Sequence, residues 1–191
     1  PRASSSSPRF LRLVAFQHVA AAIDGQSPGA FSGRAFRHQA VEWQYSQPGA
    51  GARTTGGRWN PANSFATLYL ALSEETAAAE LHRLAARAGR DVDDFMPRHL
   101  LEFDLELGGL LDLTDLDALH AVGLNEDRLH QNDATACQEV GEAAHHLGRE
   151  GVLAPSATGV GIVLAVFVER VLPESRFEVV STTVWESITR D

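Results

Sequence analysis

The sequence predicts an α+β fold built as one main domain. Three expected strands, residues 151–156, 161–172 and 176–185, follow one another near the C-terminus without intervening helices. The two long expected helices, 74–88 and 132–150, do not alternate regularly with the strands. This mixed order favours α+β over a parallel, doubly wound sheet. The length of 191 residues also suits a single domain.

The first 45 residues are expected to form a helix, a loop and a strand after a flexible start. Residues 1–8, PRASSSSP, are expected to be flexible, and residues 9–191 are expected to form the domain. Residues 9–23 have a mixed periodicity that leans toward helix. Residues 24–33 contain the glycine and proline breakers of a loop, and the aromatic content of 35–45 predicts a strand.

A long loop and the first well-marked helix follow. Residues 46–66 contain prolines, asparagines and a Gly-Gly pair, which predicts a long irregular loop, and such loops inside compact domains are often functional. Residues 67–72 form an expected buried strand. The helix 74–88 is expected to begin after Ser73 as N-cap and to end at Gly89.

The middle of the chain is expected to return to the sheet and then to helix. Residues 98–107 alternate between apolar and polar types, which predicts a strand. Residues 110–122 indicate a short strand followed by a helical turn capped at Thr114 or Asp115. The second long helix, 132–150, has Asp133 near its start, where the helix dipole favours a carboxylate.

The composition is that of a globular protein and excludes several classes of function. Hydrophobic residues make up 44% of the chain, but the longest apolar run, 162–168, is shorter than the roughly 18 residues of a membrane span. The polar segment 1–8 does not resemble a signal peptide. The single cysteine, Cys137, excludes an internal disulfide and a cysteine-cluster metal site, so a cytoplasmic location is expected.

Charge is unevenly distributed along the chain. The net charge is −9, and all 16 basic residues are arginines. Residues 1–60 carry seven arginines against Asp24 and Glu42, a net charge of +5, whereas residues 61–191 carry nine arginines against 23 acidic residues, a net charge of −14. The acidic total disfavours general nucleic-acid binding, because phosphate contacts dominate that affinity. A local group of arginines can still bind a small phosphorylated ligand through bidentate hydrogen bonds.

The most conspicuous candidates for chemistry lie in and around the expected long loop. Arg37 and Tyr69 lie in the strands on either side of it, and the segment GGRWNP occupies residues 56–61. The glycines allow the backbone to approach a ligand closely, and Arg58 would project from this turn. The same pattern fits a structural turn with Trp59 in the core, and it places Tyr69 more readily in the core than against a ligand.

Glu80 is the strongest carboxylate candidate because of its place in the helix 74–88. Ala77 and Leu84 flank it on the same helix face and are expected to belong to the apolar stripe, which would direct the carboxylate toward the interior or a cleft. A buried carboxylate needs a partner to offset the cost of desolvation. The alternative is an ordinary surface ion pair between Glu80 and Arg83, three residues later.

The remaining residues favour no other kind of catalytic site. Ser156 follows Pro155 at a strand end, where turn serines are common, and no G-x-S-x-G motif surrounds it. The eight histidines are scattered, and the adjacent His145 and His146 point to different helix faces, so no metal site is predicted. Cys137 is expected to be a buried helix residue and not a nucleophile.

Four segments, in chain order, form a recognisable set: GGRWNP (56–61), LYLALSEETAAAE (68–80), CQEVGEAA (137–144) and GVLAPS (151–156). Together they resemble the RES-domain family, whose members are toxins of bacterial toxin–antitoxin pairs. The resemblance spans about residues 35 to 170. It implies a fold like that of the diphtheria-toxin-like ADP-ribosyltransferases, and an activity that consumes NAD.

The resemblance also implies roles for individual residues. The family's arginines fall on Arg37 and Arg58, which would bind the diphosphate or ribose of NAD. Its glutamate falls on Glu80, which would stabilise the positive charge that develops on the ribose carbon as the nicotinamide–ribose bond breaks. The implied catalytic residues are Glu80, Arg37 and Tyr69, and the implied NAD-binding residues are Arg37, Arg58, Trp59, Tyr69, Glu80 and Ser156.

Aromatic and polar residues complete the implied site. The family's aromatic residue falls on Tyr69, and either Tyr69 or Trp59 would stack on nicotinamide. Its serine falls on Ser156, which would orient a hydroxyl or an arginine. Gln138 and Gly141 match the Q-x-x-G of the family's second long helix.

The expected function is therefore that of a cytoplasmic toxin that degrades NAD by glycohydrolysis or phosphorolysis, without a metal. An Xre-like antitoxin is expected to cover the active site, and phosphate is a second expected ligand if the reaction is phosphorolysis. The acidic charge leaves any DNA binding to the antitoxin. Two alternatives remain open, namely a protein ADP-ribosyltransferase with the same cleft and a catalytically inactive binding module. The products formed from NAD distinguish all of them.

Overall fold

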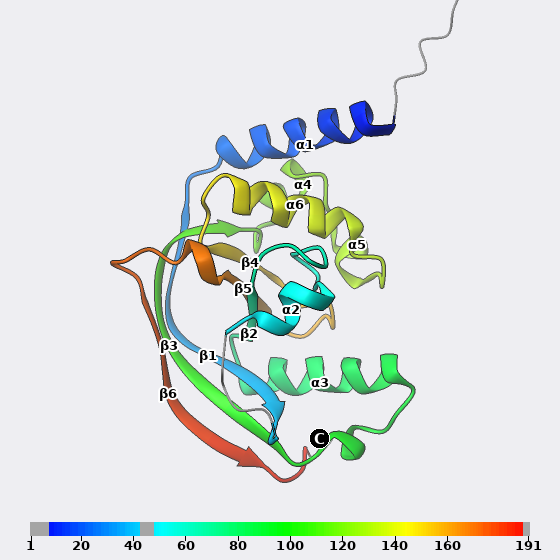
Figure 1. Ribbon diagram of the computed structural model, residues 1–191, viewed down its shortest axis with the longest axis vertical. Coiled ribbons are helices and arrows are strands. Elements are labelled where there is room, and N and C mark those ends of the chain that lie inside the picture. The colour runs from blue at the N-terminus through cyan, green and yellow to red at the C-terminus, as the bar shows by residue number, and fades with distance from the viewer. Residues whose placement is uncertain (1–7, 43–47, 189–191) are drawn as a thin grey trace, which may run out of the picture.

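A six-stranded sheet forms the centre of the protein (Figure 1). The computed structural model describes residues 8–42 and 48–188. The strands are β1 (Gly29–Ala40), β2 (Thr67–Ala71), β3 (Arg98–Asp112), β4 (Gly151–Pro155), β5 (Ile162–Phe167) and β6 (Arg176–Trp185). Their order is β1-β2-β5-β4-β3-β6, and β1 also pairs with β3, so the strands β1 to β5 close into a ring. The pair β3–β4 is parallel, and the other strand pairs are antiparallel.

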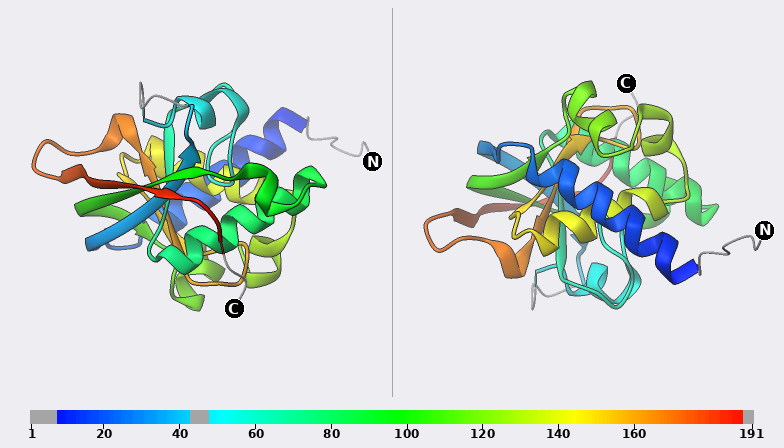
Figure 2. Two further views of the ribbon diagram at one scale, coloured as in Figure 1. Left: turned by 90° about the horizontal axis from the view of Figure 1, so that it is seen from below. Right: turned by 90° about the horizontal axis from the view of Figure 1, so that it is seen from above.

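Helices cover the sheet at two separate places (Figures 1 and 2). They are α1 (Pro8–Asp24), α2 (Ala50–Thr55), α3 (Glu74–Ala88), α4 (Leu116–Ala121), α5 (Glu126–His130) and α6 (Thr135–His146), with short 3-10 turns η1 (Val92–Phe95) and η2 (Val168–Arg170). Helix α1 lies along α6, whereas α3 packs against β1 and β2 at the other end of the view in Figure 1. This arrangement confirms the predicted α+β class. In the described part of the chain, no helix combines the length and the apolar character that a membrane crossing requires.

Two buried clusters on opposite faces of the sheet hold these layers together. One cluster fills the space inside the ring and includes Leu70, Phe103 and Leu164. The other lies between the sheet and the helices α1 and α6 and includes Trp59 and Phe167. Because successive side chains of a strand point to opposite faces, β2, β3, β4 and β5 contribute to both clusters.

The best-predicted element is α3, whose bounds are those expected from its caps. The Ser73 hydroxyl accepts a hydrogen bond from the Thr76 N–H at 3.1 Å, which satisfies one free donor of the first turn. Gly89 has a φ of 64°, the left-handed conformation that closes many helices. The helix predicted for residues 9–23 and the strand predicted for 67–72 are also confirmed as α1 and β2.

The first strand begins earlier and ends earlier than the sequence indicates. The prediction of a loop over 24–33 is wrong from Gly29 onward, because Gly29 to Arg34 pair with the neighbouring strand β3 where the ring closes. This pairing supplies backbone hydrogen bonds that outweigh the poor strand propensity of glycine and serine. The strand predicted for 35–45 ends at Ala40, and part of it lies outside the described residues.

Other boundaries also move where tertiary contacts decide. The expected irregular loop 46–66 contains the short helix α2, and residues 110–112 extend β3 instead of forming a separate strand. The helix predicted for 132–150 is shorter, because α6 begins at Thr135 and ends at His146. The strand predicted for 161–172 ends at Phe167 and continues as η2.

Three further predictions, for the turn near Asp115, for α5 and for residues 1–8, have different outcomes. The helical turn capped at Asp115 is confirmed as α4, since the Asp115 carboxylate accepts from the Asp117 N–H at 2.9 Å. Helix α5 was not predicted, because five residues are too few to show a periodicity. The predicted flexible segment 1–8 lies outside the described residues, except for Pro8, at which α1 begins.

A fully buried carboxylate joins β3, β4 and the turn before β6. Glu150 directly precedes β4 and is 0% exposed. Its Oε2 accepts hydrogen bonds from the N–H groups of Gly108 and Gly109, at 2.9 and 2.7 Å. Its Oε1 accepts from the Leu172 N–H at 3.0 Å and from the Ser175 hydroxyl. One side chain therefore satisfies donors from two distant segments.

Candidate functional site

Glu80 and Ser156 come together where α3 meets the end of β4. The Ser156 hydroxyl donates a hydrogen bond to Oε1 of Glu80 at 2.7 Å, and Ser156 itself is fully buried. Of the two neighbours expected to form an apolar stripe, Ala77 is buried, but Leu84 is 45% exposed, so that part of the prediction is wrong. Glu80 therefore lies at the edge of the buried face, with one carboxylate oxygen committed to Ser156.

The loop that follows β4 fixes the position of Ser156. The Ser156 hydroxyl also lies 2.7 Å from the Thr158 hydroxyl and accepts from the Thr158 N–H at 3.1 Å. The Ser156 N–H donates to the Gly161 carbonyl at 2.9 Å. Gly161 has a φ of +65°, and a Cβ at this position would overlap the Thr76 hydroxyl of α3. The loop is thus held against the first turn of the helix that carries Glu80.

The segment 56–61 forms a tight turn whose Asn60 side chain is fully buried. The Gly57 N–H donates to the Asn60 carbonyl at 2.8 Å, and Gly56 has a φ of 77°. The Asn60 amide donates to the Ala52 carbonyl at 2.7 Å, which ties the turn to α2. Buried polar groups need such partners, and Asn60 explains why an asparagine stands at this position of the motif.

The buried Trp59 side chain and the Tyr69 hydroxyl stabilise this turn. The Trp59 side chain is 0% exposed within the cluster under α6, so its ring presents no face to a ligand, and the stacking role left open for Trp59 is wrong. The Tyr69 hydroxyl accepts from the Trp59 N–H and donates to Oδ1 of Asn60, both at 2.8 Å. Burial raises the pKa of the Tyr69 phenol, so it remains protonated and able to donate. Gly57 lies directly against the ring, and a Cβ there would overlap the phenol.

Tyr69→Phe is therefore expected to destabilise the protein by about 1–3 kcal/mol, because it leaves the backbone N–H of the buried Trp59 without its partner. The ring and its packing remain, so a cavity does not contribute. Urea unfolding of both proteins measures the difference. A change below about 0.5 kcal/mol, the usual size for a surface substitution, would contradict the supporting role of the hydroxyl.

Helix α6 holds the same turn from the other side. Gln138 donates through Nε2 to the Gly57 carbonyl at 2.9 Å. A Cβ at Gly141 would overlap the Trp59 carbonyl, so only glycine allows the helix to lie this close to the turn. The Q-x-x-G pattern of the sequence is thereby explained as a contact surface for residues 57–59.

Arg58 projects from the turn toward the connection between α5 and α6. Its Nη2 donates to the Gln131 carbonyl at 2.9 Å, and its Nη1 lies 3.9 Å from Sγ of Cys137. Burial raises the pKa of the Cys137 thiol, which agrees with the expectation that this cysteine is a buried helix residue and not a nucleophile. Arg58 forms no ion pair with a carboxylate of the described residues.

Arg37 reaches the site from β1 through the backbone of β2. Its Nη1 donates to the Tyr69 carbonyl at 3.0 Å. The neighbouring His38 accepts through Nδ1 from Nε of Arg98 at 3.1 Å. Burial, with the charges of Arg98 and Arg37, lowers the pKa of His38 to about 3, so His38 is neutral at physiological pH. The structure thus links Arg37 to Tyr69, and Tyr69 to the turn that carries Arg58.

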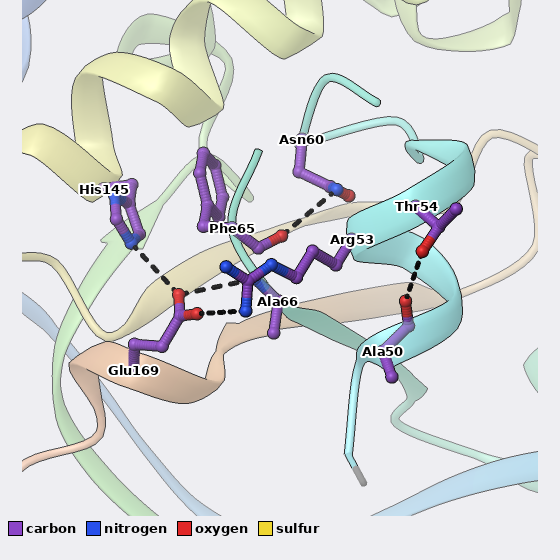
Figure 3. Close-up of polar contacts among 8 residues, drawn as sticks. All are labelled: Ala50, Arg53, Thr54, Asn60, Phe65, Ala66, His145 and Glu169. Carbon is purple, nitrogen blue, oxygen red and sulfur yellow. Dashed lines mark hydrogen bonds and ion pairs between the residues drawn. The ribbon is translucent and has the colours of Figure 1, made fainter. Parts of the chain in front are cut away.

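A second polar cluster anchors the loop between α2 and β2 (Figure 3). Glu169 of η2 lies 3.6 Å from the Arg53 guanidinium and 3.7 Å from Nε2 of His145, and it accepts from the Ala66 N–H at 3.4 Å. The His145 ring is stacked on Phe65 with a centroid separation of 3.9 Å, and burial lowers its pKa. These contacts fix both ends of the segment from which Arg58 projects.

Arg83 is a site residue that sequence reasoning did not identify. Instead of pairing with Glu80, it donates through Nη1 to the Ala157 carbonyl at 2.7 Å and through Nη2 to the His130 carbonyl at 3.3 Å. Its spacing from Glu80 suggested only a surface ion pair, because residues three apart share a helix face, and gave no sign of these backbone partners. Thr158 was missed because its role depends on the loop conformation.

The surface depressions of the protein are weaker candidates for an active site. Two surface depressions, of ≈ 480 and ≈ 490 Å³, border the Glu150 junction and are lined mainly by glycines, serines and apolar residues. We place the candidate site at Glu80 instead, because Glu80, Ser156 and Arg83 come together there. Within residues 8–42 and 48–188, no three His, Cys, Asp or Glu side chains are grouped in a way that could hold a metal ion.

Comparisons with known proteins point to one family. The family model described as "RES domain" matches residues 12–185. Proteins named "NAD(+) phosphorylase MbcT" from Mycobacterium tuberculosis and Mycobacterium bovis are 39% identical over 127 residues, which cover 65% of this chain and 68% of theirs. A chain in the crystal structure of the M. tuberculosis MbcT–MbcA toxin–antitoxin complex matches with a TM-score of 0.77 and 31% identity, over 88% of this chain and 92% of that one. Since the family model covers nearly the whole described chain, this protein belongs to the RES domain family.

Proposed function

We propose that this chain is a cytoplasmic toxin that cleaves NAD+ at the nicotinamide–ribose bond and transfers the ADP-ribosyl group to inorganic phosphate. The observation that carries the proposal is the contact between Glu80 and the buried Ser156, beside Arg83, which donates to the carbonyl of the next residue, Ala157. The names of the mycobacterial relatives support phosphate as the acceptor over water.

The proposed mechanism assigns the carboxylate to the reacting carbon. As the C–N bond breaks, its electron pair leaves with nicotinamide, and positive charge develops on the ribose carbon. Glu80 stabilises this charge, as carboxylates do in glycoside cleavage. Ser156 positions Glu80 by donating to Oε1 and leaves Oε2 for the substrate. A phosphate oxygen then bonds to the ribose carbon to give ADP-ribose 1″-phosphate, and no base is required because phosphate is already anionic.

The remaining site residues bind NAD+ or position the residues that bind it. Arg58 and Arg37 bind the diphosphate of NAD+, since guanidinium groups match phosphate oxygens in charge and geometry. Tyr69 is a positioning residue, because its hydroxyl is bonded to the turn that carries Arg58 and its ring lies against Gly57. We also propose that residues 9–191 act as one NAD-binding domain with the diphtheria-toxin-like ADP-ribosyltransferase fold, which the mixed sheet and the placement of Arg37, Tyr69 and Glu80 on β1, β2 and α3 support.

The proposed partner is an antitoxin that covers the same site. The similar chain from M. tuberculosis was crystallised in a toxin–antitoxin complex, which supports a protein inhibitor for this chain as well. The partner we expect is an Xre-like antitoxin, and any DNA binding would belong to it because this chain carries a net charge of −9.

One incubation tests this function. The purified chain, free of antitoxin, is mixed with NAD+ in phosphate buffer, in phosphate-free buffer and with a protein lysate, and the products are separated. We expect nicotinamide and ADP-ribose 1″-phosphate in phosphate buffer. Free ADP-ribose in phosphate buffer would show that the reaction is hydrolysis and not phosphorolysis. Lysate protein that carries the ADP-ribosyl group would indicate a transferase. Intact NAD+ under all three conditions would overturn the proposal in favour of an inactive binding module.

A further inference from the structure

Arg83 joins three segments of the candidate site. It lies on α3 one turn after Glu80. Its guanidinium donates to the Ala157 carbonyl at 2.7 Å and to the His130 carbonyl at 3.3 Å, and lies 3.5 Å from Oδ1 of Asn132. Ala157 directly follows Ser156, the partner of Glu80. The Arg83 guanidinium is therefore placed beside the carboxylate that would face the reacting carbon.

Neither Arg83 nor Arg58 forms an ion pair with a carboxylate of the described residues. All contacts of the Arg83 guanidinium are to neutral oxygens, and those of Arg58 are to the Gln131 carbonyl and the Cys137 sulfur. After burial, the charge of Arg58 is the largest cause that lowers the pKa of Arg83, so the two cations repel each other, while the nearby Glu80 carboxylate acts in the opposite direction. An anion bound between them would relieve that repulsion.

Arg83 also retains donors for such an anion. A guanidinium has five N–H groups, and the three contacts to Ala157, His130 and Asn132 use at most three of them. The two unused donors, on Nε and Nη1, lie on different edges of the guanidinium, so a bidentate pair with phosphate uses Nε–H together with an Nη2 donor released from its long contact to His130 (3.3 Å) or Asn132 (3.5 Å). The side chain is also partly exposed, so an ion can reach it.

We propose that Arg83 binds the inorganic phosphate that accepts the ADP-ribosyl group, and that it thereby favours phosphate over water as acceptor. This inference rests on the proposed function and deepens it. Arg58 and Arg37 remain available for the diphosphate of NAD+. In the step that follows, the C–N bond to nicotinamide breaks, an oxygen of the phosphate held by Arg83 bonds to the ribose carbon, and the electron pair leaves with nicotinamide. Hydrogen phosphate keeps its proton throughout, so the step needs no further reactant.

The test compares Arg83→Gln with the wild type and with Arg87→Gln. Arg87 lies one turn further along α3 with an exposed side chain, and its charge acts on Arg83 only through space, so its substitution controls for the loss of a nearby positive charge without removing the guanidinium that contacts Ala157. Initial rates are measured against phosphate concentration at saturating NAD+, and against NAD+ at saturating phosphate. For Arg83→Gln we expect the KM for phosphate to rise at least tenfold, the KM for NAD+ to change less than threefold, and the ratio of ADP-ribose to ADP-ribose 1″-phosphate to increase. Arg87→Gln should match the wild type, and Arg83→Lys should recover part of the phosphate affinity.

Two outcomes would overturn the inference. A KM for phosphate that is unchanged in Arg83→Gln would exclude Arg83 from the acceptor site. An equal rise in the KM for phosphate and the KM for NAD+, together with a lower melting temperature, would show that Arg83 only holds the loops at Ala157 and His130 in place. A binding measurement separates this inference from the proposed function. Inorganic phosphate should raise the melting temperature of the wild type more than that of Arg83→Gln, and this shift without any NAD+ cleavage would reject the reaction while supporting the phosphate site.

Discussion

Glu80→Gln is expected to slow NAD+ cleavage by about a hundred- to a thousandfold without unfolding the protein. The amide keeps the shape of the side chain and can still accept the hydrogen bond that Ser156 donates at 2.7 Å. It loses the negative charge that the proposed mechanism uses to stabilise the ribose carbon. Nicotinamide release at saturating NAD+ measures the effect, and thermal melting compares the folds.

Glu75→Gln is the matched control for this substitution. Glu75 lies in the first turn of the same helix and is exposed, and it is not among the hydrogen-bond partners of the Ser156 hydroxyl. Its activity should equal that of the wild type. If Glu80→Gln retained more than about a tenth of the wild-type rate, Glu80 would not be the residue that stabilises the developing charge, because one decade corresponds to only about 1.4 kcal/mol of barrier.

Glu150→Ala is expected to lower the free energy of unfolding by more than about 3 kcal/mol. The substitution removes a fully buried carboxylate that accepts from the N–H groups of Gly108, Gly109 and Leu172, and a donor left without a partner away from water costs about 1–3 kcal/mol. Water entering the space left by the side chain would reduce this cost only in part. Urea unfolding followed by tryptophan fluorescence measures the change.

Glu174→Ala is the control for this second substitution. Glu174 belongs to the same turn before β6, but its side chain is exposed. We expect its effect on stability to stay within about 0.5 kcal/mol, as for most surface substitutions. A Glu150→Ala protein as stable as the Glu174→Ala protein would show that the buried carboxylate does not hold β3 to this turn.

Local signals were sufficient to predict some elements but not others. Helix α3 could be predicted to the residue because Ser73 and Gly89 mark its ends within the sequence itself. The first part of β1 could not, because its strand conformation comes from pairing with the distant strand β3, as with Gly29 opposite Leu110. The continuation of β3 through its two glycines likewise depends on Glu150, which is distant in sequence.

The candidate site shows the same division. The resemblance to a known family identified Glu80 and Ser156, and the structure brings them into contact. It could not show that Trp59 is buried, because an aromatic residue in a loop motif fits a core position and a ligand platform equally well. Arg83 escaped notice because its partners are backbone carbonyls, which no side-chain pattern reveals.

The backbone of residues 130–132 and an anionic ligand compete for the same donors. Arg58 donates to the Gln131 carbonyl and Arg83 to the His130 carbonyl, so both guanidinium groups hold the connection between α5 and α6 in place. A ligand that takes these N–H groups must first displace the carbonyls. The apparent affinity for the anion is therefore reduced by the free energy of those contacts, and occupancy of the site becomes coupled to the order of this connection. Protection of its amides from hydrogen exchange should accordingly fall when phosphate binds.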